Sequence, residues 1–213
     1  MKNCLLLLFA CLWSAPLRAQ PVPPEPLPGS TGGFHQTHTG QILFSPTTLP
    51  AEEYPGAAHI GLSTYALGPQ SSLNFTAFLG ASLAQVLHRL TSRLPLARLA
   101  TTGTYQFRFY VDARLVYLAN LPAGAMDPTA ESTATVLREA LIDEQKKTGG
   151  WGQSLWRRFL ANGGNKALTQ GQHLLRLEIR PYFQHPLLRD APVLAAGQVA
   201  LDVTVPMTAK MPR

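Results

Sequence analysis

The stretch YQFRFYVDARLVYL, residues 105–118, decides the fold. In residues 105–111 large apolar side chains occupy the odd positions, and more polar ones such as Gln106 and Arg108 occupy even positions. Because successive side chains of a β-strand point to opposite faces, this period of two predicts a strand with one apolar face. Asp112-Ala113 then predicts a turn, and residues 114–118 a returning strand that completes a hairpin.

Runs elsewhere in the chain extend the same pattern. Residues 175–179 alternate Leu or Ile with charged side chains, and residues 199–205 place Val or Leu at every odd position. Residues 134–142 fit a strand or a helix, and their early Thr and Val residues favour the strand. Shorter extended patterns predict further strands at 41–45, 60–66 and 73–78.

Helical periodicity is confined to two short segments. Residues 82–94 and 154–161 carry apolar side chains at three- and four-residue spacings, which predicts two amphipathic helices. With 46% hydrophobic and 14% charged residues, the chain is neither disordered nor a coiled coil. The predicted class is all-β: a β-sandwich of about seven to nine mostly antiparallel strands with one or two short helices.

The first nineteen residues have the pattern of a secretory signal peptide. A basic start precedes an apolar run and then a segment of small residues. The apolar run is too short to cross a bilayer, which needs about 20 residues. We therefore expect cleavage between Ala19 and Gln20, and an exported protein, periplasmic or secreted, without a transmembrane segment after processing. The alternative is lipid attachment at Cys11, which would tether the chain to a membrane.

The rest of the chain divides into three parts. Residues 20–40 are rich in Pro and Gly and predict a disordered arm or linker. Residues 41–206 hold all the strand patterns and predict a single β-sandwich domain. Residues 207–213 form a C-terminal tail.

Removal of the leader changes the chemistry of the chain. Both cysteines, Cys4 and Cys11, lie within it, so the processed chain has no thiol and no disulfide. Loss of Lys2 and Arg18 leaves 16 basic against 12 acidic residues, a net charge of 16 − 12 = +4. This modest excess forms no basic run, so we expect no nucleic-acid partner.

Motifs of catalysis and of metal binding are absent from the sequence. It contains no Gly-x-Ser-x-Gly elbow, no His-Glu-x-x-His helix and no phosphate-binding loop. His35 and His38 lie three apart in the predicted arm, without a neighbouring acid or thiol, so we expect no metal site there. His173 beside Gly171 predicts a turn role. No cofactor is expected.

The segment from Gly149 to Phe159 is the best candidate for ligand binding. Trp151 lies among glycines, which predicts an exposed loop position where its ring could stack on a sugar. Arg157 and Arg158 could bind carboxylates or phosphates beside it, and Tyr182 belongs to a second aromatic pair. A purely structural role of Trp151 stays open, and Trp156 is expected to plug one end of the sandwich.

Three functions remain compatible with these features. The first is an exported, non-catalytic protein of the cell envelope that binds a protein or a glycan. The second is an exported hydrolase acting on glycans, which needs two carboxylates that the fold brings together. The third is a structural accessory subunit of an envelope complex, which would expose a contiguous apolar patch. The candidate acids for the second are Asp112, Asp143, Glu144 and Glu178.

Overall fold

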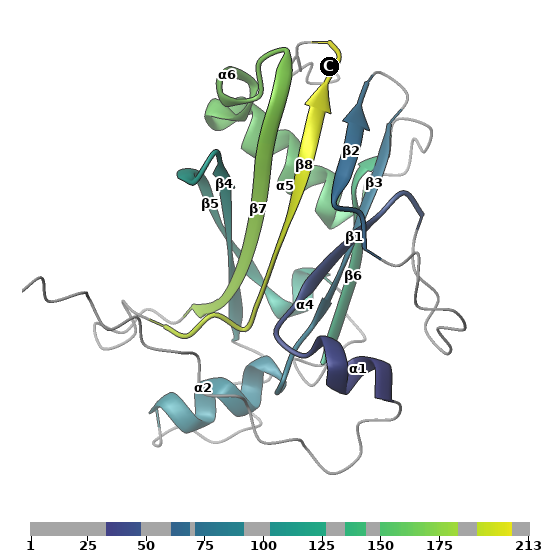
Figure 1. Cartoon of the computed structure of the whole chain (residues 1–213). Helices are drawn as coiled ribbons and strands as arrows, with labels where there is room; N and C mark the ends of the chain where they lie inside the picture. Colours follow the sequence, from purple (N-terminus) through teal and green to yellow (C-terminus); the bar gives the residue numbers. More distant parts are fainter. Residues whose placement is uncertain are drawn as a thin grey trace, which may run out of the picture.

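Two β-sheets make up most of the structure, a computed structural model that describes residues 33–47, 61–68, 71–91, 103–126, 135–143, 150–182 and 191–205 (Figure 1). Sheet A has the order β2-β8-β7-β4-β5, with bounds Thr64–Leu67, Ala195–Val203, Gly171–Tyr182, Thr104–Val111 and Arg114–Pro122. Sheet B has the order β1-β3-β6, with bounds Ile42–Ser45, Ser72–Phe78 and Val136–Asp143. Neighbouring strands are antiparallel except β2 and β8. The predicted all-β class is confirmed.

The predicted hairpin is β4 and β5, joined at Asp112 and Ala113. Both turn residues have positive φ, 49° and 67°, as a two-residue turn between twisted strands requires. Phe109 pairs with Tyr117 and the next residue, Tyr110, with Leu115. The intervening residue of β5 is therefore a bulge, and the strand extends four residues beyond the predicted end at 118.

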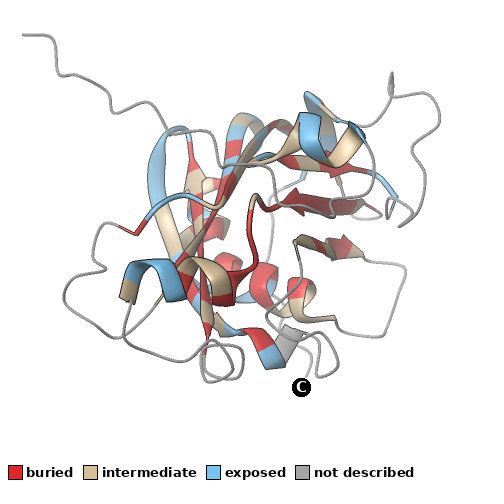
Figure 2. Cartoon of the chain, turned by 90° about the horizontal axis from the view of Figure 1, so that it is seen from below, coloured by how far each residue is buried: buried red, intermediate tan, exposed pale blue. Residues whose placement is uncertain are grey.

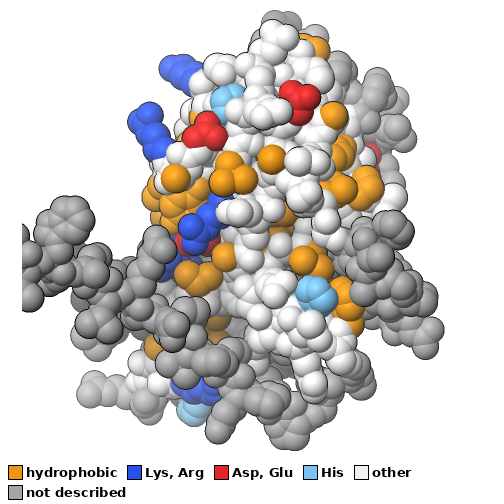
Figure 3. Space-filling view, in the orientation of Figure 1, with side chains coloured by type: hydrophobic (Ala, Val, Ile, Leu, Met, Phe, Trp, Pro, Cys, Tyr) orange, Lys and Arg blue, Asp and Glu red, His pale blue; other side chains and the backbone are white. Residues whose placement is uncertain are grey.

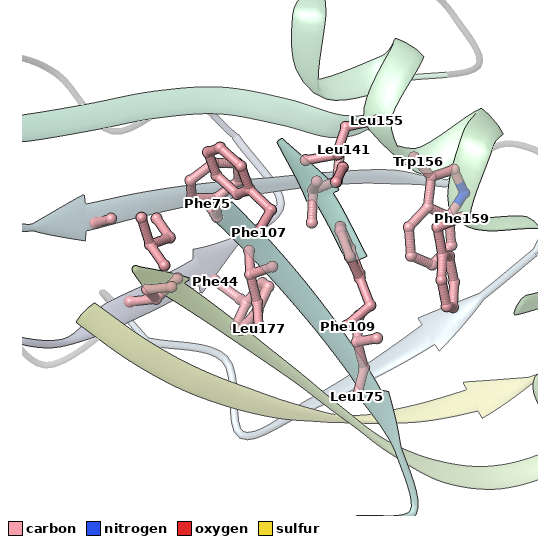
Figure 4. Close-up of a cluster of buried hydrophobic side chains, with 14 of the residues drawn as sticks. Phe44, Phe75, Phe107, Phe109, Leu141, Leu155, Trp156, Phe159, Leu175 and Leu177 are labelled. Carbon is pink, nitrogen blue, oxygen red and sulfur yellow. The ribbon is translucent and has the colours of Figure 1, made fainter. Parts of the chain in front are cut away.

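The facing sides of the two sheets enclose one hydrophobic core. Phe107 of β4 faces Phe75 and Phe44 of sheet B, and Leu175 and Leu177 of β7 point into the same core (Figure 4). Seen from below, the buried residues gather in the middle of the molecule, and the exposed ones lie mainly on turns and helices (Figure 2). The alternation that predicted the strands thus describes which side of each faces the core.

Helix α5 (Trp151–Phe159) bridges the open side between β6 of sheet B and β5 of sheet A. Its Phe159 ring stacks on Phe109, with centroids 4.9 Å apart, and Trp156 packs against Phe159. Trp156 is buried, as expected of a residue that plugs the sandwich. A Cβ at Gly152 would lie 2.6 Å from the carbonyl oxygen of Ala140, so glycine is needed for this close approach of helix and strand.

The opposite side of the sandwich is closed where β1 meets β8. Gln41 forms a parallel bridge with Ala196, whose amide donates to the carbonyl oxygen of Gly40 over 2.9 Å. A Cβ on Gly197 would lie 2.0 Å from the carbonyl oxygen of Ile42. The two sheets can join here because residue 197 has no side chain.

Short helices complete the described chain. The predicted helix at 82–94 is α2, Leu83–Thr91, which Ser82 and Gln85 cap reciprocally. The helix predicted at 154–161 instead begins at Trp151, because residues 151–153 already pack along β6. The strand predicted at 60–66 is β2, which is shorter than predicted and covers Thr64–Leu67. The remaining helical segments are α4 (Ala123–Met126), η2 (Leu160–Gly164) and α6 (Asn165–Ala167).

The end of the predicted arm is helical. Residues Gly33–His38 form α1 instead of a flexible linker, because the Phe34 ring finds an apolar partner in Phe78, 5.6 Å away. His35 Nε2 lies 3.1 Å from the carbonyl oxygen of Leu79. The rest of the predicted arm, the leader with its cleavage site and Cys11, and the tail at 207–213 lie outside the described residues.

Substitution of Gly197 by Ala should destabilise the protein. The new methyl group must displace the backbone at Ile42, and we expect a loss of about 2–3 kcal/mol in the free energy of unfolding, measured by urea denaturation. Gly124→Ala in α4 is the matched control, because a Cβ there meets nothing within 4 Å. Equal stability of the two variants would contradict the close approach of β1 and β8.

Candidate functional site

A connected set of polar side chains lies on the outer face of sheet A, turned away from the core. The antiparallel register of β4 and β7 sets these side chains in three cross-strand pairs. We call them the Glu178 network: Gln106 with Arg180, Arg108 with Glu178, and Tyr110 with Arg176. Side chains opposite one another on a sheet face lie about 5 Å apart at Cβ, close enough to contact directly.

Glu178 is the centre of this network and is only 3% exposed. Arg180 donates from Nε and Nη2 to its Oε2, over 3.2 and 3.0 Å, and Arg176 donates from Nη2 to its Oε1. The Tyr110 hydroxyl donates to Oε2 over 3.2 Å. These bonds offset the cost of removing a carboxylate from water. Alternation along β7 places Glu178 on the outer face of sheet A, where its neighbours cover it.

Each arginine of the network is held by a different contact. Arg180 also donates from Nη1 to the carbonyl oxygen of Ala191, over 3.0 Å. Arg176 lies over the ring of Tyr110, with its guanidinium carbon 5.5 Å from the ring centroid, a cation–π arrangement. Arg108 donates from Nε to Gln106 Oε1 over 2.7 Å. All three guanidinium groups are therefore oriented before any partner arrives.

Exposed leucines border the network. Leu118 is paired with Arg108 across β4 and β5, and Leu115 with Tyr110; their exposed fractions are 40% and 45%. Leu174 of β7, on the same face, is 38% exposed. Figure 3 shows basic and hydrophobic side chains side by side over β4, β5 and β7. This mixture of apolar, aromatic and arginine side chains is typical of protein-binding surfaces.

The structure separates the candidate residues that the sequence singled out. Trp151 is the first residue of α5 and not part of a loop. Its ring packs against those of Phe75 and Phe107, with centroids 5.8 and 5.5 Å away. Arg157 and Arg158 are exposed on α5. Tyr182 ends β7, on the outer face of sheet A, two residues beyond Arg180. Helix α5 packs on the inner side of that sheet, so Tyr182 and Trp151 do not form one site.

Asp112 fastens the β4–β5 turn to β7. Its Oδ1 accepts from the Leu174 amide over 2.9 Å, and its Oδ2 lies 2.8 Å from His173 Nδ1. His173 Nε2 lies 3.1 Å from the carbonyl oxygen of Thr169, which is the turn role expected from the sequence. The hydrogen bond with His173, and then that with the Leu174 amide, lowers the pKa of Asp112.

The candidate acids do not approach one another in the described residues. A hydrolase of the expected type needs two carboxylates about 5–9 Å apart. Asp112 lies beside the β7 residue four positions before Glu178, which is roughly 13 Å along a strand. Asp143 ends β6 in the other sheet, and Glu144 lies outside the described residues. Asp112 and Glu178 therefore do not form a carboxylate pair of this kind.

One half-buried acid was not among the candidates. Glu139 of β6 is paired with Phe75, and its carboxylate lies at the start of α5, where a Cβ on Gly150 would meet its Oε1 at 2.5 Å. Burial raises the pKa of Glu139, and a hydrogen bond from the Ala140 amide opposes this. The other acid of β6 is Asp143, four residues after Glu139 and therefore roughly 13 Å away along the strand.

The described residues show neither a metal cluster nor a spanning helix. No group of three or more His, Cys, Asp or Glu side chains gathers among them. His38 Nδ1 lies 2.9 Å from the carbonyl oxygen of Phe34 within α1. In the same part of the chain, each helix is too short or too polar to cross a bilayer.

Comparison with known proteins assigns no family to the chain. No family model and no curated protein matches it. Among solved structures it is similar to a CARDB domain from Pyrococcus furiosus, in solution, at 7% identity and a TM-score of 0.27, over 78% of this chain and 94% of that one. A crystal structure of that domain in complex with di-metal ions is similar at 8% identity and a TM-score of 0.25, over 79% of this chain and 96% of that one. Similarity this low transfers neither a ligand nor a function.

Replacement of Glu178 by Gln should destabilise the sheet. The variant leaves Arg176 and Arg180 as neighbouring cations without their shared carboxylate, and we expect a loss of about 2–3 kcal/mol in urea denaturation. Asp202→Asn, which removes an exposed acid of β8, should change the stability by less than about 0.5 kcal/mol. A Glu178→Gln variant as stable as Asp202→Asn would show that the network contributes nothing to folding.

The contact of Asp112 should make stability depend on acid pH. Because the folded pKa lies below the unfolded value, the carboxylate stabilises the fold above the unfolded pKa, and this stabilisation disappears as the pH falls through the folded pKa. Asp112→Asn should therefore lower the urea midpoint at about pH 6 and converge on the wild type towards about pH 2. A difference that stays constant between these pH values would contradict the role of the ionised carboxylate.

Proposed function

We propose that this chain is an exported, non-catalytic protein of the cell envelope that binds a partner through the outer face of sheet A. The observation that carries the proposal is the Glu178 network with its border of exposed leucines. A buried carboxylate at the centre of an outer sheet face is costly unless it organises its neighbours. Here it holds two arginines beside Tyr110, and arginine and tyrosine are enriched where proteins bind one another.

Export rests on the signal-peptide pattern of residues 1–19. Such a leader directs a chain out of the cytoplasm. The partner of the exported chain would then be a component of the envelope. The proposal of binding without catalysis is supported by the separation of Asp112 from Glu178 and by the absence of catalytic motifs from the sequence.

A structural accessory subunit is the second candidate. The specific observation in its favour is that Leu115, Leu118 and Leu174 are exposed on one sheet face. A subunit would hold its partner permanently, whereas a binding module would exchange it. Size-exclusion chromatography of the complex at decreasing concentration separates the two, because a permanent complex stays intact on dilution.

The binding face can be tested with a matched pair of leucines. Leu118 on β5 and Leu90 on α2 are 40% and 39% exposed. Recovery of a partner from envelope fractions by the processed chain should fall at least about tenfold for Leu118→Asp, because a charge now opposes burial of that face. Leu90→Asp should leave recovery unchanged.

A separate measurement checks the location of the protein. N-terminal sequencing of the chain isolated from the envelope should begin at Gln20. An intact Met1 in the cytosolic fraction would disprove export. Equal recovery by the two leucine variants would disprove the proposed binding face.

A further inference from the structure

Two arginines of the Glu178 network keep hydrogen-bond donors that no described residue accepts. Arg108 uses Nε on Gln106, and no acceptor among the described residues bonds its Nη1 or Nη2. Arg176 uses Nη2 on Glu178, and its Nε and Nη1 have no acceptor in that part of the chain either. Nη1 and Nη2 of Arg108 lie along one edge of the guanidinium and can bind a carboxylate through two parallel hydrogen bonds, whereas Nε and Nη1 of Arg176 point to different sides and donate singly. By contrast, Arg180 has every nitrogen engaged.

The charges on this face favour an anionic ligand. The guanidinium groups of Arg176 and Arg180 bind the Glu178 carboxylate, and Arg108 occupies the paired position on β4. With three arginines and one carboxylate, the network keeps a local excess of two positive charges. Arg176 is half exposed, at 47% of its side chain, so its free donors reach solvent. Contacts with Tyr110, Gln106 and Glu178 already restrict both arginines, which lowers the entropy that a ligand must remove on binding.

The spacing of the two arginines matches an extended peptide. Arg108 is paired with Glu178, and Arg176 lies two residues away on β7, so the arginines are diagonal neighbours. Diagonal positions on a sheet are about 7–8 Å apart. In an extended chain, side chains two residues apart point the same way and lie about 6.5–7 Å apart. Acidic residues at alternate positions can therefore reach both guanidinium groups at once.

The border of the network favours a polypeptide over a glycan. On β5, Leu118 lies opposite Arg108 of β4 and Leu115 lies opposite Tyr110. On β7, Leu174 is two residues before Arg176 on the same face. Apolar side chains of a peptide can cover these leucines, whereas a uronic-acid glycan offers carboxylates but little apolar surface for them.

We propose that the outer face of sheet A binds an extended acidic polypeptide segment. Carboxylates at alternate positions of the segment bind Arg108 and Arg176, and flanking apolar side chains cover the exposed leucines. This inference rests on the proposed function and adds to it the chemistry of the partner.

The test uses the processed chain and labelled peptides in which glutamate and threonine alternate between terminal leucines. Fluorescence anisotropy should show binding of this peptide and no binding of its glutamine counterpart. Arg108→Gln and Arg176→Gln should each weaken binding about tenfold, the effect of losing one charge-assisted contact. Salt at about 0.5 M should also weaken it, because exposed charges are screened.

Lys166→Gln is the charge-matched control. Lys166 is an exposed residue of α6, outside sheet A, and its loss should leave the affinity for the peptide unchanged. Circular dichroism of each variant shows whether it is folded. Equal binding of the glutamate and glutamine peptides, or an equal effect of Lys166→Gln and Arg108→Gln, would overturn the inference.

Two further outcomes separate this inference from the proposed function. If a uronic-acid oligosaccharide binds in an arginine-dependent way and the peptide does not, the acidic-peptide inference is wrong although the face binds ligands. If Leu118→Asp abolishes recovery of the partner but neither acidic probe binds, the proposed function stands and the inference fails. If Leu118→Asp has no effect and neither probe binds, both fail.

Discussion

The structure depends on covering the inner face of a five-stranded sheet with a sheet of only three strands. Sheet B leaves one side of the sandwich open. If Phe109 were exposed there, the fold would lose the favourable free energy of burying a large aromatic side chain. Helix α5 supplies the cover, with Phe159 stacked on Phe109. The helix can approach because residue 152 has no side chain against β6. The Gly-rich segment before Trp156 therefore serves packing.

Among the described residues, no second layer lies over the other face of sheet A. A sheet face of this size is usually polar, and here alternate residues of β4 and β7 supply the polar side chains. Their charges are not scattered: Glu178 gathers Arg176 and Arg180, and Tyr110 closes the group. Burial of Glu178 is tolerable only while every partner is present. The network is thus held at its centre by Glu178, and at its edge Arg108 and Arg176 keep donors that no described residue uses.

Much of the fold could be predicted from the sequence. The hairpin at 105–118, the strands at 175–179 and 199–205 and the helix at 82–94 all follow from neighbouring residues, although the last strand ends at Val203. The site could not be predicted in the same way. The polar residues of β4 and β7 were visible as alternating positions, but nothing local indicates that Arg108 is placed beside Glu178, seventy residues later. The positions favoured instead, Trp151 with Arg157 and Arg158, stand out in sequence and lie on a helix on the inner side of sheet A.

The sequence by itself determined which residues of each strand share a face, because a strand's period of two is a property of its own backbone. Only the tertiary structure decided which strands lie side by side, because pairing depends on how all the apolar faces are buried together. The same distinction holds for Glu178: its outer position followed from alternation, while its burial came from the side chains of two other positions on β7 and one on β4. The start of α5 at Trp151, too, was set by contact with β6 and not by the local glycines, which alone predict a loop.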